Sequence, residues 1–257
     1  MKSFIRIKNL KYKDIINNLS LSIKKNDFIT ISGSNKCGKT TLIKILSRVI
    51  KTNNRVIIND KPIEEYDIDK YSSIVSRVIF DEDNKYLFDT IESELKYDLD
   101  DEERYKKIIK LFKLSKYQKN NPNNLDINIK MKFLLAKAII LKPKILLLDD
   151  VCLYMNNNET KEFMKILKHL QKNENMTIIM ATDKLEETIY SDYLYILSEG
   201  KIVLKGNPLE VLKNDNTLNK LGLELPFMVD LSMKLKDYEL VNNIELDIDR
   251  MVNILWK

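Results

Sequence analysis

An octapeptide near the N-terminus combines the residue types that bind phosphate. It reads Gly33-Ser34-Asn35-Lys36-Cys37-Gly38-Lys39-Thr40 and is followed by Thr41. Glycines let backbone N–H groups turn inward onto phosphate oxygens, and the N-terminus of a following helix adds about half a positive charge. In this spacing the lysine reaches the β- and γ-phosphates of a nucleotide, and the threonine hydroxyl holds Mg²⁺. We therefore predict a nucleoside triphosphate site, with Lys39 and Thr40 as its principal side chains.

A chance match to this spacing is the alternative interpretation. The chain has only five glycines among 257 residues, and two of them, Gly33 and Gly38, belong to this loop. A strand-like segment, Asp27–Ser32, precedes the loop, and Lys39–Val49 follows it with helical spacing. A strand before and a helix after are what a phosphate-binding loop requires, so the context favours that interpretation.

A second segment supplies the residue type that binds a metal ion. An apolar run, Ile145–Leu148, ends in the paired acids Asp149 and Asp150. Phosphate-loop ATPases hold Mg²⁺ with a carboxylate placed at the end of such a strand. A buried strand followed by a helix cap is the alternative. Because a phosphate loop lies upstream, we predict that Asp149 is a Mg²⁺ ligand.

The elements that must position these residues alternate along the chain. Strand patterns alternate with helical patterns, which predicts an α/β fold with a mostly parallel sheet. A helical insertion is expected between two of the strands, and three short helical patterns follow Gly206. The expected strands are Phe4–Leu10, Leu19–Ile23, Asp27–Ser32, Arg55–Ile58, Ser76–Phe80, Lys144–Asp149, Thr177–Ala181, and a hairpin of Tyr193–Leu197 with Lys201–Leu204. The expected helices are Lys39–Val49, Ile91–Tyr97, Glu102–Leu114, Ile129–Leu141, Thr160–Gln171 and Leu185–Ser191.

Composition excludes several classes of protein. The 43 Lys+Arg and 38 Asp+Glu leave a net charge of +5 that is spread along the chain, so nucleic-acid binding is not predicted. No apolar run approaches the roughly 20 residues that span a bilayer, and the N-terminus does not resemble a signal peptide. Two cysteines and one histidine exclude a cysteine cage, a disulfide framework and chemistry that needs two histidines. We expect a protein of the reducing cytoplasm.

The order of these motifs resembles that of ABC-type ATPase subunits. The tail segments Leu221–Phe227 and Val229–Leu231, the closing Leu255-Trp256 and the segment Asp89–Leu95 resemble energy-coupling factor ATPases in particular. The resemblance implies a phosphate-loop NTPase fold of the ABC type, with a mostly parallel sheet core, an antiparallel β subdomain and a helical subdomain. It implies an ATPase domain over residues 1–205, a helical subdomain near 83–141, and a helical C-terminal dimerisation extension over 206–257.

The resemblance also implies a function and partners. Energy-coupling factor ATPases bind ATP and Mg²⁺ and drive uptake of vitamins or metal ions. Two subunits meet head to tail, so each ATP lies between one phosphate loop and the other subunit's signature loop. The implied partners are a second ABC ATPase subunit (identical or different), a transmembrane scaffold subunit and a substrate-binding membrane subunit. The implied location is peripheral, on the cytoplasmic face of the cell membrane.

Several family motifs are altered in this chain. Asp81 stands where the family has a Gln that touches Mg²⁺ and the membrane partner. Asp150 replaces the catalytic Glu and is one methylene shorter, a displacement that can cost about 100-fold in rate. Asp183 replaces the switch His and brings negative charge toward the γ-phosphate. Leu125–Ile129 replaces the signature Leu-Ser-Gly-Gly-Gln. We therefore predict Mg-ATP binding with slow hydrolysis at this subunit's own site.

Four further residues carry individual expectations. Asp126 either faces phosphate or caps a helix that begins near Ile129. Ile127 replaces a glycine and is strained if that position needs positive φ. Tyr12 either stacks on adenine or is an ordinary strand aromatic. Cys37 lies near a helix N-terminus and a lysine, which predicts a lowered pKa and alkylation slowed by ATP.

Two rival functions remain open. In the first, the chain is a regulatory pseudo-ATPase that binds ATP while its partner hydrolyses it. The substitutions at Asp150, Asp183 and Leu125–Ile129 favour this rival. In the second, the chain is a soluble kinase or ATPase with no role in transport. Loss of the signature loop allows that interpretation, and the tail argues against it.

Overall fold

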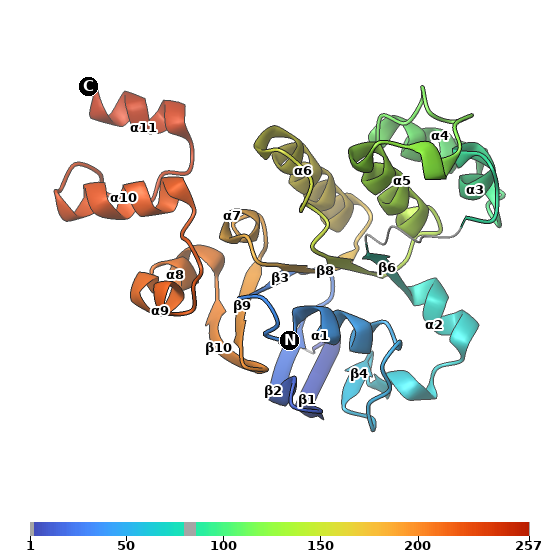
Figure 1. Ribbon diagram of the computed structural model, residues 1–257, viewed down its shortest axis with the longest axis horizontal. Helices are drawn as coiled ribbons and strands as arrows, with labels where there is room; N and C mark the ends of the chain where they lie inside the picture. The colour runs from blue at the N-terminus through green and yellow to red at the C-terminus, as the bar shows by residue number, and fades with distance from the viewer. Residues whose placement is uncertain (1–2, 80–85, 257) are drawn as a thin grey trace.

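The computed structural model describes residues 3–79 and 86–256, which form two sheets with helices around them (Figure 1). The larger sheet has six strands in the order β10-β9-β3-β8-β7-β6. β9, β3, β8, β7 and β6 run parallel, and β10 pairs antiparallel to β9. Their bounds are β3 Phe28–Ser32, β6 Val75–Ile79, β7 Ile145–Asp149, β8 Thr177–Thr182, β9 Tyr193–Ser198 and β10 Lys201–Gly206.

The smaller sheet is antiparallel, with the order β2-β1-β4-β5. Helix α1 lies between the two sheets, because its apolar side chains share one core with both of them. The bounds are β1 Ile5–Tyr12, β2 Ile16–Ile23, β4 Val56–Ile58, β5 Lys61–Pro62 and α1 Lys39–Leu46. A short 3₁₀ helix, Ile63–Glu65, and α2, Ile68–Ile74, lead from this sheet to β6.

The two faces of the parallel sheet are covered by different helices. On β7, Ile145 and Leu147 point into the core around α1. Leu146 and Leu148 point into a second core, which they share with the helices inserted between β6 and β7 and with the helix that follows β7. Successive side chains of a strand point to opposite faces, so a central parallel strand must be apolar at every position. This is why the Asp149 carboxylate stands out at the end of an otherwise apolar strand.

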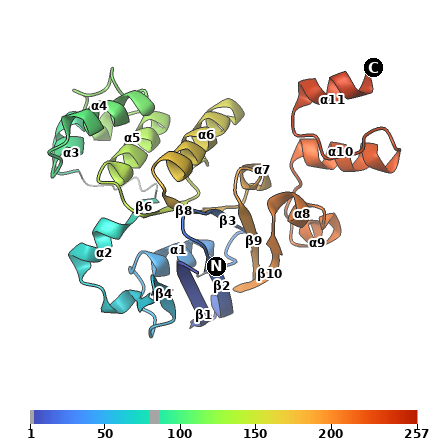
Figure 2. The same cartoon turned by 180° about the vertical axis from the view of Figure 1, so that it is seen from behind.

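The second core holds the helices inserted between β6 and β7, together with α6 (Figure 2). Side-chain caps begin three of these α-helices. Thr90 accepts a bond from the Ser93 amide, Asp101 accepts one from the Arg104 amide, and Asn156 accepts bonds from the Asn158 and Glu159 amides. The helices are α3 Ile91–Lys96, α4 Glu102–Leu111, the 3₁₀ turn Pro122–Asn124, α5 Ile127–Ile139, and α6 Asn157–Asn173, which follows β7. A short helix, α7 Leu185–Thr188, follows β8.

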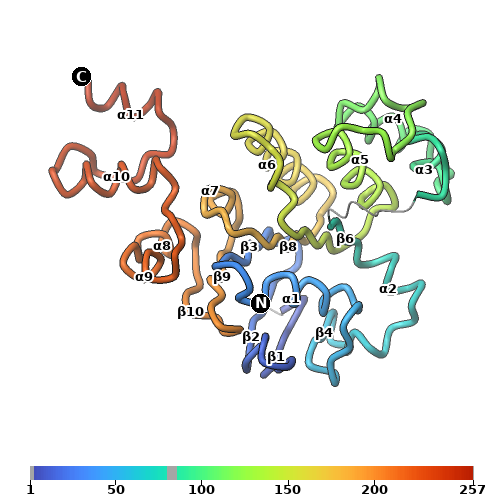
Figure 3. Tube along the Cα trace, viewed as in Figure 1, coloured from blue at the N-terminus to red at the C-terminus, as the bar shows by residue number. Residues whose placement is uncertain are grey.

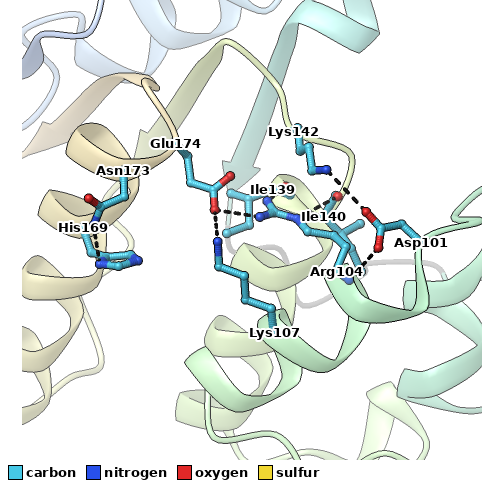
Figure 4. A network of polar contacts seen from close by, with 9 residues as sticks. All are labelled: Asp101, Arg104, Lys107, Ile139, Ile140, Lys142, His169, Asn173 and Glu174. Carbon is cyan, nitrogen blue, oxygen red and sulfur yellow. Dashed lines mark hydrogen bonds and ion pairs between the residues drawn. The ribbon is translucent and has the colours of Figure 1, made fainter.

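One buried arginine ties this insertion to α6 (Figure 4). Arg104 of α4 donates to the carbonyls of Ile139 and Ile140 at the end of α5, at 2.9 and 3.3 Å. Its third bond, 2.8 Å long, goes to the carboxylate of Glu174 at the end of α6, which also accepts from Lys107. Arg104 therefore neutralises a carboxylate and satisfies two helix-terminal carbonyls at once.

Replacing Arg104 with Met is expected to lower the free energy of unfolding by about 3 kcal/mol, because it leaves Glu174 and two carbonyls without their buried partner. The matched control is Lys113→Met. Lys113 also pairs with an acid of α6, Glu162, but both of these side chains are exposed, so its loss should cost about 0.5 kcal/mol or less. Urea unfolding followed by circular dichroism measures both changes. Equal losses of stability would contradict the inference that the buried contacts of Arg104 stabilise the packing of the insertion against α6.

Beyond Gly206 the structure has four helices within the described residues, and the expectation of three was wrong. They are α8 Pro208–Leu212, α9 Asp215–Lys220, α10 Phe227–Asp237 and α11 Ile248–Leu255. The first two pack against β9 and β10, while α10 and α11 lie at the edge of the molecule (Figure 3). Large apolar side chains on this outer part, among them Phe227, Ile248 and Trp256, are exposed.

The sequence patterns located most elements within a few residues. β5, α2 and the two short 3₁₀ helices were not predicted. Other ends differ by up to three residues; α1, for example, ends at Leu46 rather than at Val49. Phe80, the predicted end of β6, lies outside the described residues. Within residues 3–79 and 86–256, none of the helices has the length and hydropathy needed to cross a membrane.

Candidate nucleotide and magnesium site

The predicted phosphate loop connects the carboxyl end of β3 to the first turn of α1. Lys39, the first residue of α1, is buried, and its Nζ donates to the carbonyls of Gly33 and Ser34 at 2.6 and 3.2 Å. Gly38 is the N-cap of α1 and has φ +112, a left-handed value that residues with a Cβ rarely adopt. The loop therefore wraps around an ammonium group at a helix N-terminus, which is an arrangement suited to an anion.

Two candidate oxygen ligands meet beside this loop. The Thr40 hydroxyl donates to the Asp149 carboxylate at 3.2 Å. They come from different elements, α1 and the end of β7, because both follow the same edge of the parallel sheet. Burial is the largest influence on Asp149 and raises its pKa, while the Thr40 bond and Lys39 oppose that shift. A buried carboxylate beside a hydroxyl matches the hard oxygen ligands that Mg²⁺ takes.

Asp150 lies next to this pair in an unusual backbone conformation. Its φ is +48, a left-handed value that aspartate tolerates better than most residues, and its amide donates to the Ala181 carbonyl at 3.0 Å. Burial raises the pKa of Asp150 to about 6, with Asp149 and Asp183 adding to the shift and Lys39 opposing it. Asp150 is therefore a stronger base than an ordinary aspartate and is still mostly ionised at neutral pH.

The structure gathers more negative charge here than the sequence indicated. Asp183 follows the end of β8 and acts on Asp150 through its charge. Glu187 of α7, which sequence reasoning did not single out, is 2% exposed and has a pKa raised to about 7, mainly by burial. The charges of Asp150 and Asp183 contribute to that shift. Nothing in the short segment Leu185–Thr188 distinguishes a buried glutamate from a surface one.

The altered signature segment differs from the expectation in two ways. Helix α5 begins at Ile127, so this residue has helical backbone and the strain anticipated for a left-handed position does not arise. Asp126 is the N-cap residue, but in the part of the chain that the structure describes its side chain makes no capping bond, so the capping interpretation was wrong. Asn128 instead donates to Glu159 on α6 at 3.0 Å.

The remaining predicted residues lie around the loop. Asn35 and Lys36 are exposed, and Ser34 and Thr41 are partly buried. Tyr12 ends β1, pairs with Ile16 across the β1–β2 turn, and has the Lys13 ammonium 5.5 Å from its ring centroid. Stacking of Tyr12 on adenine stays a prediction. Asp81 lies outside the described residues.

The expected lowering of the Cys37 pKa was wrong. The thiol is 5% exposed, and burial raises its pKa above the usual value, although Lys39 and backbone N–H groups act in the opposite direction. Desolvation disfavours the thiolate more strongly than the nearby positive groups favour it.

Native Cys37 is therefore expected to react with iodoacetamide at least about tenfold more slowly than cysteine in a short peptide near pH 8, because only the thiolate reacts. ATP should slow the reaction further by covering the loop. Peptide mapping by mass spectrometry separates Cys37 from Cys152, which is also free and buried. Labelling at the peptide rate, or labelling unaffected by ATP, would contradict this placement.

Comparison with known proteins agrees with the geometry. The sequence profile described as "ABC transporter" matches residues 16–152. The chain is 27% identical over 250 residues to an energy-coupling factor transporter ATP-binding protein, EcfA1, from Mycoplasma mobile, with 91% of each chain covered. It is 27% identical over 274 residues to EcfA1 of Clostridioides difficile, with 98% of each covered.

Solved structures show the same fold. CbiO1 from Clostridium perfringens, part of the ABC transporter complex cbiONQ, superposes with a TM-score of 0.75 at 23% identity, covering 90% of this chain and 99% of that one. An ATP-binding cassette dimer in a post-hydrolysis state with ADP and phosphate superposes with a TM-score of 0.69 at 19% identity, covering 79% of this chain and 98% of that one. The predicted α/β fold class is confirmed.

Proposed function

This chain belongs to the ABC transporter family of ATP-hydrolysing subunits, and from that membership we propose that it is the ATP-binding subunit of an energy-coupling factor importer. The bond between Thr40 and Asp149 beside the loop that wraps Lys39 is the observation that carries the ATP-binding part. Relatives named as energy-coupling factor proteins match over nearly the whole chain, including the tail, and support the importer type. The cargo is a vitamin or a metal ion.

In this proposal different residues of the chain bind different parts of Mg-ATP. Lys39 and the amides of the phosphate loop hold the β- and γ-phosphates, and Tyr12 stacks on adenine. Thr40 and Asp149 hold Mg²⁺, with Asp81 as a third candidate ligand. The bound metal supplies charge neutralisation at the phosphates and orients them.

We further propose that hydrolysis at this site is weak. Asp150 is the candidate base, and its carboxylate is shorter by one methylene than the family's glutamate. Asp183 adds negative charge where phosphate charge develops, and Glu187 lies buried behind the same edge of the sheet. These carboxylates oppose the transition state electrostatically, so ATP binding is retained better than ATP turnover.

The proposed assembly follows from the family. Residues 1–205 form the ATPase domain, residues 83–141 its helical subdomain, and 206–257 a dimerisation extension whose exposed apolar side chains suit a protein partner. The partners are a second ATPase subunit, a transmembrane scaffold and a substrate-binding membrane subunit, at the cytoplasmic face of the cell membrane. In the family, a serine at the start of this helix contacts the ATP bound by the partner subunit, and this chain has Asp126 there. A partner with an intact signature loop would therefore suit this chain's own phosphate loop better than a second copy of the chain would.

The test is steady-state ATP turnover by the membrane complex that copurifies with the tagged chain, compared with its Asp150→Asn variant. The control is Asp98→Asn, because Asp98 also has a left-handed backbone, φ +57, and is exposed on the insertion. Unchanged turnover in Asp150→Asn supports weak hydrolysis here, with the partner site doing most of the work. A collapse restricted to Asp150→Asn would make this subunit a full ATPase and would contradict that part of the proposal.

Two rivals are separated from this proposal by further measurements. In a complex where only this subunit's site can work, weak hydrolysis predicts slow ATP turnover, whereas a regulatory pseudo-ATPase predicts none. A soluble ATPase or kinase predicts recovery in the cytosol without any membrane subunit. That last result would contradict the importer assignment itself.

A further inference from the structure

We propose that Gly200 is a positioning residue that fixes the phosphate loop against the turn carrying Tyr12, and so sets the span between the triphosphate and base ends of the nucleotide site. This inference rests on the proposed ATP site. Gly200 lies in the turn of the β9–β10 hairpin, far in sequence from both parts that it joins. Figure 2 shows this hairpin beside β2, and contacts between β10 and β2 agree with that view.

The peptide at Gly200 bonds to both parts. Its N–H donates to the Cys37 carbonyl inside the phosphate loop at 3.2 Å. Its carbonyl accepts from the Asn17 amide, just after the β1–β2 turn, at 3.0 Å. The same turn is closed by a bond from the Ile15 amide to the Tyr12 carbonyl, 3.1 Å long. One residue therefore connects the loop around Lys39 to the turn that begins at Tyr12.

Only glycine satisfies the geometry at this point. Glu199 and Gly200 have φ +46 and +70, the two left-handed values of a type I′ hairpin turn. An ideal Cβ on Gly200 would collide with the Ile15 carbonyl oxygen and would lie 2.8 Å from the Asn17 nitrogen. A real Cβ does not approach backbone atoms this closely, so the β1–β2 turn would have to move away.

The direction of that collision makes the inference specific. The three atoms nearest to the added carbon all belong to Ile15 and Asn17 of the β1–β2 turn, and none of them belongs to the phosphate loop. We therefore expect the β1–β2 turn, with Tyr12 at its start, to move more than the phosphate loop does. A ligand made only of phosphates should bind as before, and a nucleotide that must reach both ends should bind more weakly.

The experiment compares ATP with inorganic tripolyphosphate as ligands of the full chain by isothermal titration calorimetry in the presence of Mg²⁺. In Gly200→Ala the affinity for ATP is expected to fall about tenfold or more, while tripolyphosphate affinity changes by less than about threefold. The matched control is Gly222→Ala. Gly222 also has φ +70, but within the described residues nothing lies within 4 Å of its added Cβ. It tests left-handed strain alone.

A second variant breaks the same link without adding a Cβ at position 200. Asn17→Pro removes the amide that donates to Gly200, and Asn17 lies on the edge strand β2, where proline is tolerated best. Thermal melts confirm that each variant is folded before titration. The same loss of ATP affinity, again sparing tripolyphosphate, is expected here.

Each outcome bears on the inference. Equal weakening of ATP and tripolyphosphate would overturn it, because Gly200 would then support only the phosphate loop. Unchanged ATP affinity in both Gly200→Ala and Asn17→Pro would overturn it as well. Failure of the unaltered chain to bind ATP at all would contradict the proposed function, a result separate from any effect of the variants.

Discussion

The Lys39→Met variant is expected to bind ATP at least about 100-fold more weakly than the unaltered chain. The Lys39 ammonium is buried inside the phosphate loop and donates to two of the loop's own carbonyls. Phosphate oxygens would accept hydrogen bonds from this ammonium, and a charge-assisted hydrogen bond is about twice as strong as a neutral one. Calorimetry with ATP and Mg²⁺ measures the loss.

The matched control for this variant is Lys44→Met. Lys44 lies on the same helix, α1, and the substitution removes the same charge, but its side chain is exposed. Lys44→Met removes only the screened, long-range attraction between this ammonium group and the phosphates. We therefore expect the ATP affinity to change by less than about threefold. Similar losses in both variants would mean that Lys39 acts through net charge rather than through contact with the ligand.

The Asp149→Asn variant is expected to lose the gain in ATP affinity that Mg²⁺ provides. An amide oxygen can still accept the hydrogen bond from Thr40, so the local packing is retained. The asparagine side chain, however, lacks the negative charge that a divalent cation requires. Affinity measured with Mg²⁺ should therefore fall by about tenfold or more, to the value measured in EDTA.

A partly buried aspartate elsewhere provides the control for this second variant. Asp27 also has a pKa raised by burial, but it precedes β3 and so lies at the opposite end of that strand. Asp27→Asn should leave the response to Mg²⁺ intact. If Asp149→Asn kept the full Mg²⁺ response, the assignment of Asp149 as a metal ligand would be wrong.

Protonation of Asp149 gives the same prediction a pH dependence. Burial raises the pKa of its carboxyl, so protons compete with Mg²⁺ at a higher pH than they would at an exposed aspartate. As pH falls, the Mg²⁺-dependent part of ATP binding should decline before the Mg²⁺-independent part. The Asn variant, which carries no such proton, should show no Mg²⁺-dependent part to lose.

The sequence alone was sufficient for the features that depend on neighbouring residues. The phosphate loop could be predicted because Gly38 and Lys39 must stand at fixed positions between a strand and a helix. The Ile145–Leu148 run with Asp149 after it could be predicted because a strand buried on both faces has no polar residue until it ends. Both patterns arise from backbone geometry and side-chain period, which act over a few residues.

Tertiary structure decided whatever depends on burial and on distant partners. Sequence proximity placed Cys37 beside positive groups, but the packing around it removed water and raised its pKa. Glu187 and Asp150 come from separate segments, and the charge of Asp150 raises the pKa of Glu187 only because β7 and β8 are adjacent. Gly200 meets Cys37 and Asn17 only after the two sheets pack together. Desolvation and long-range contact depend on the whole fold, so the local pattern could not predict them.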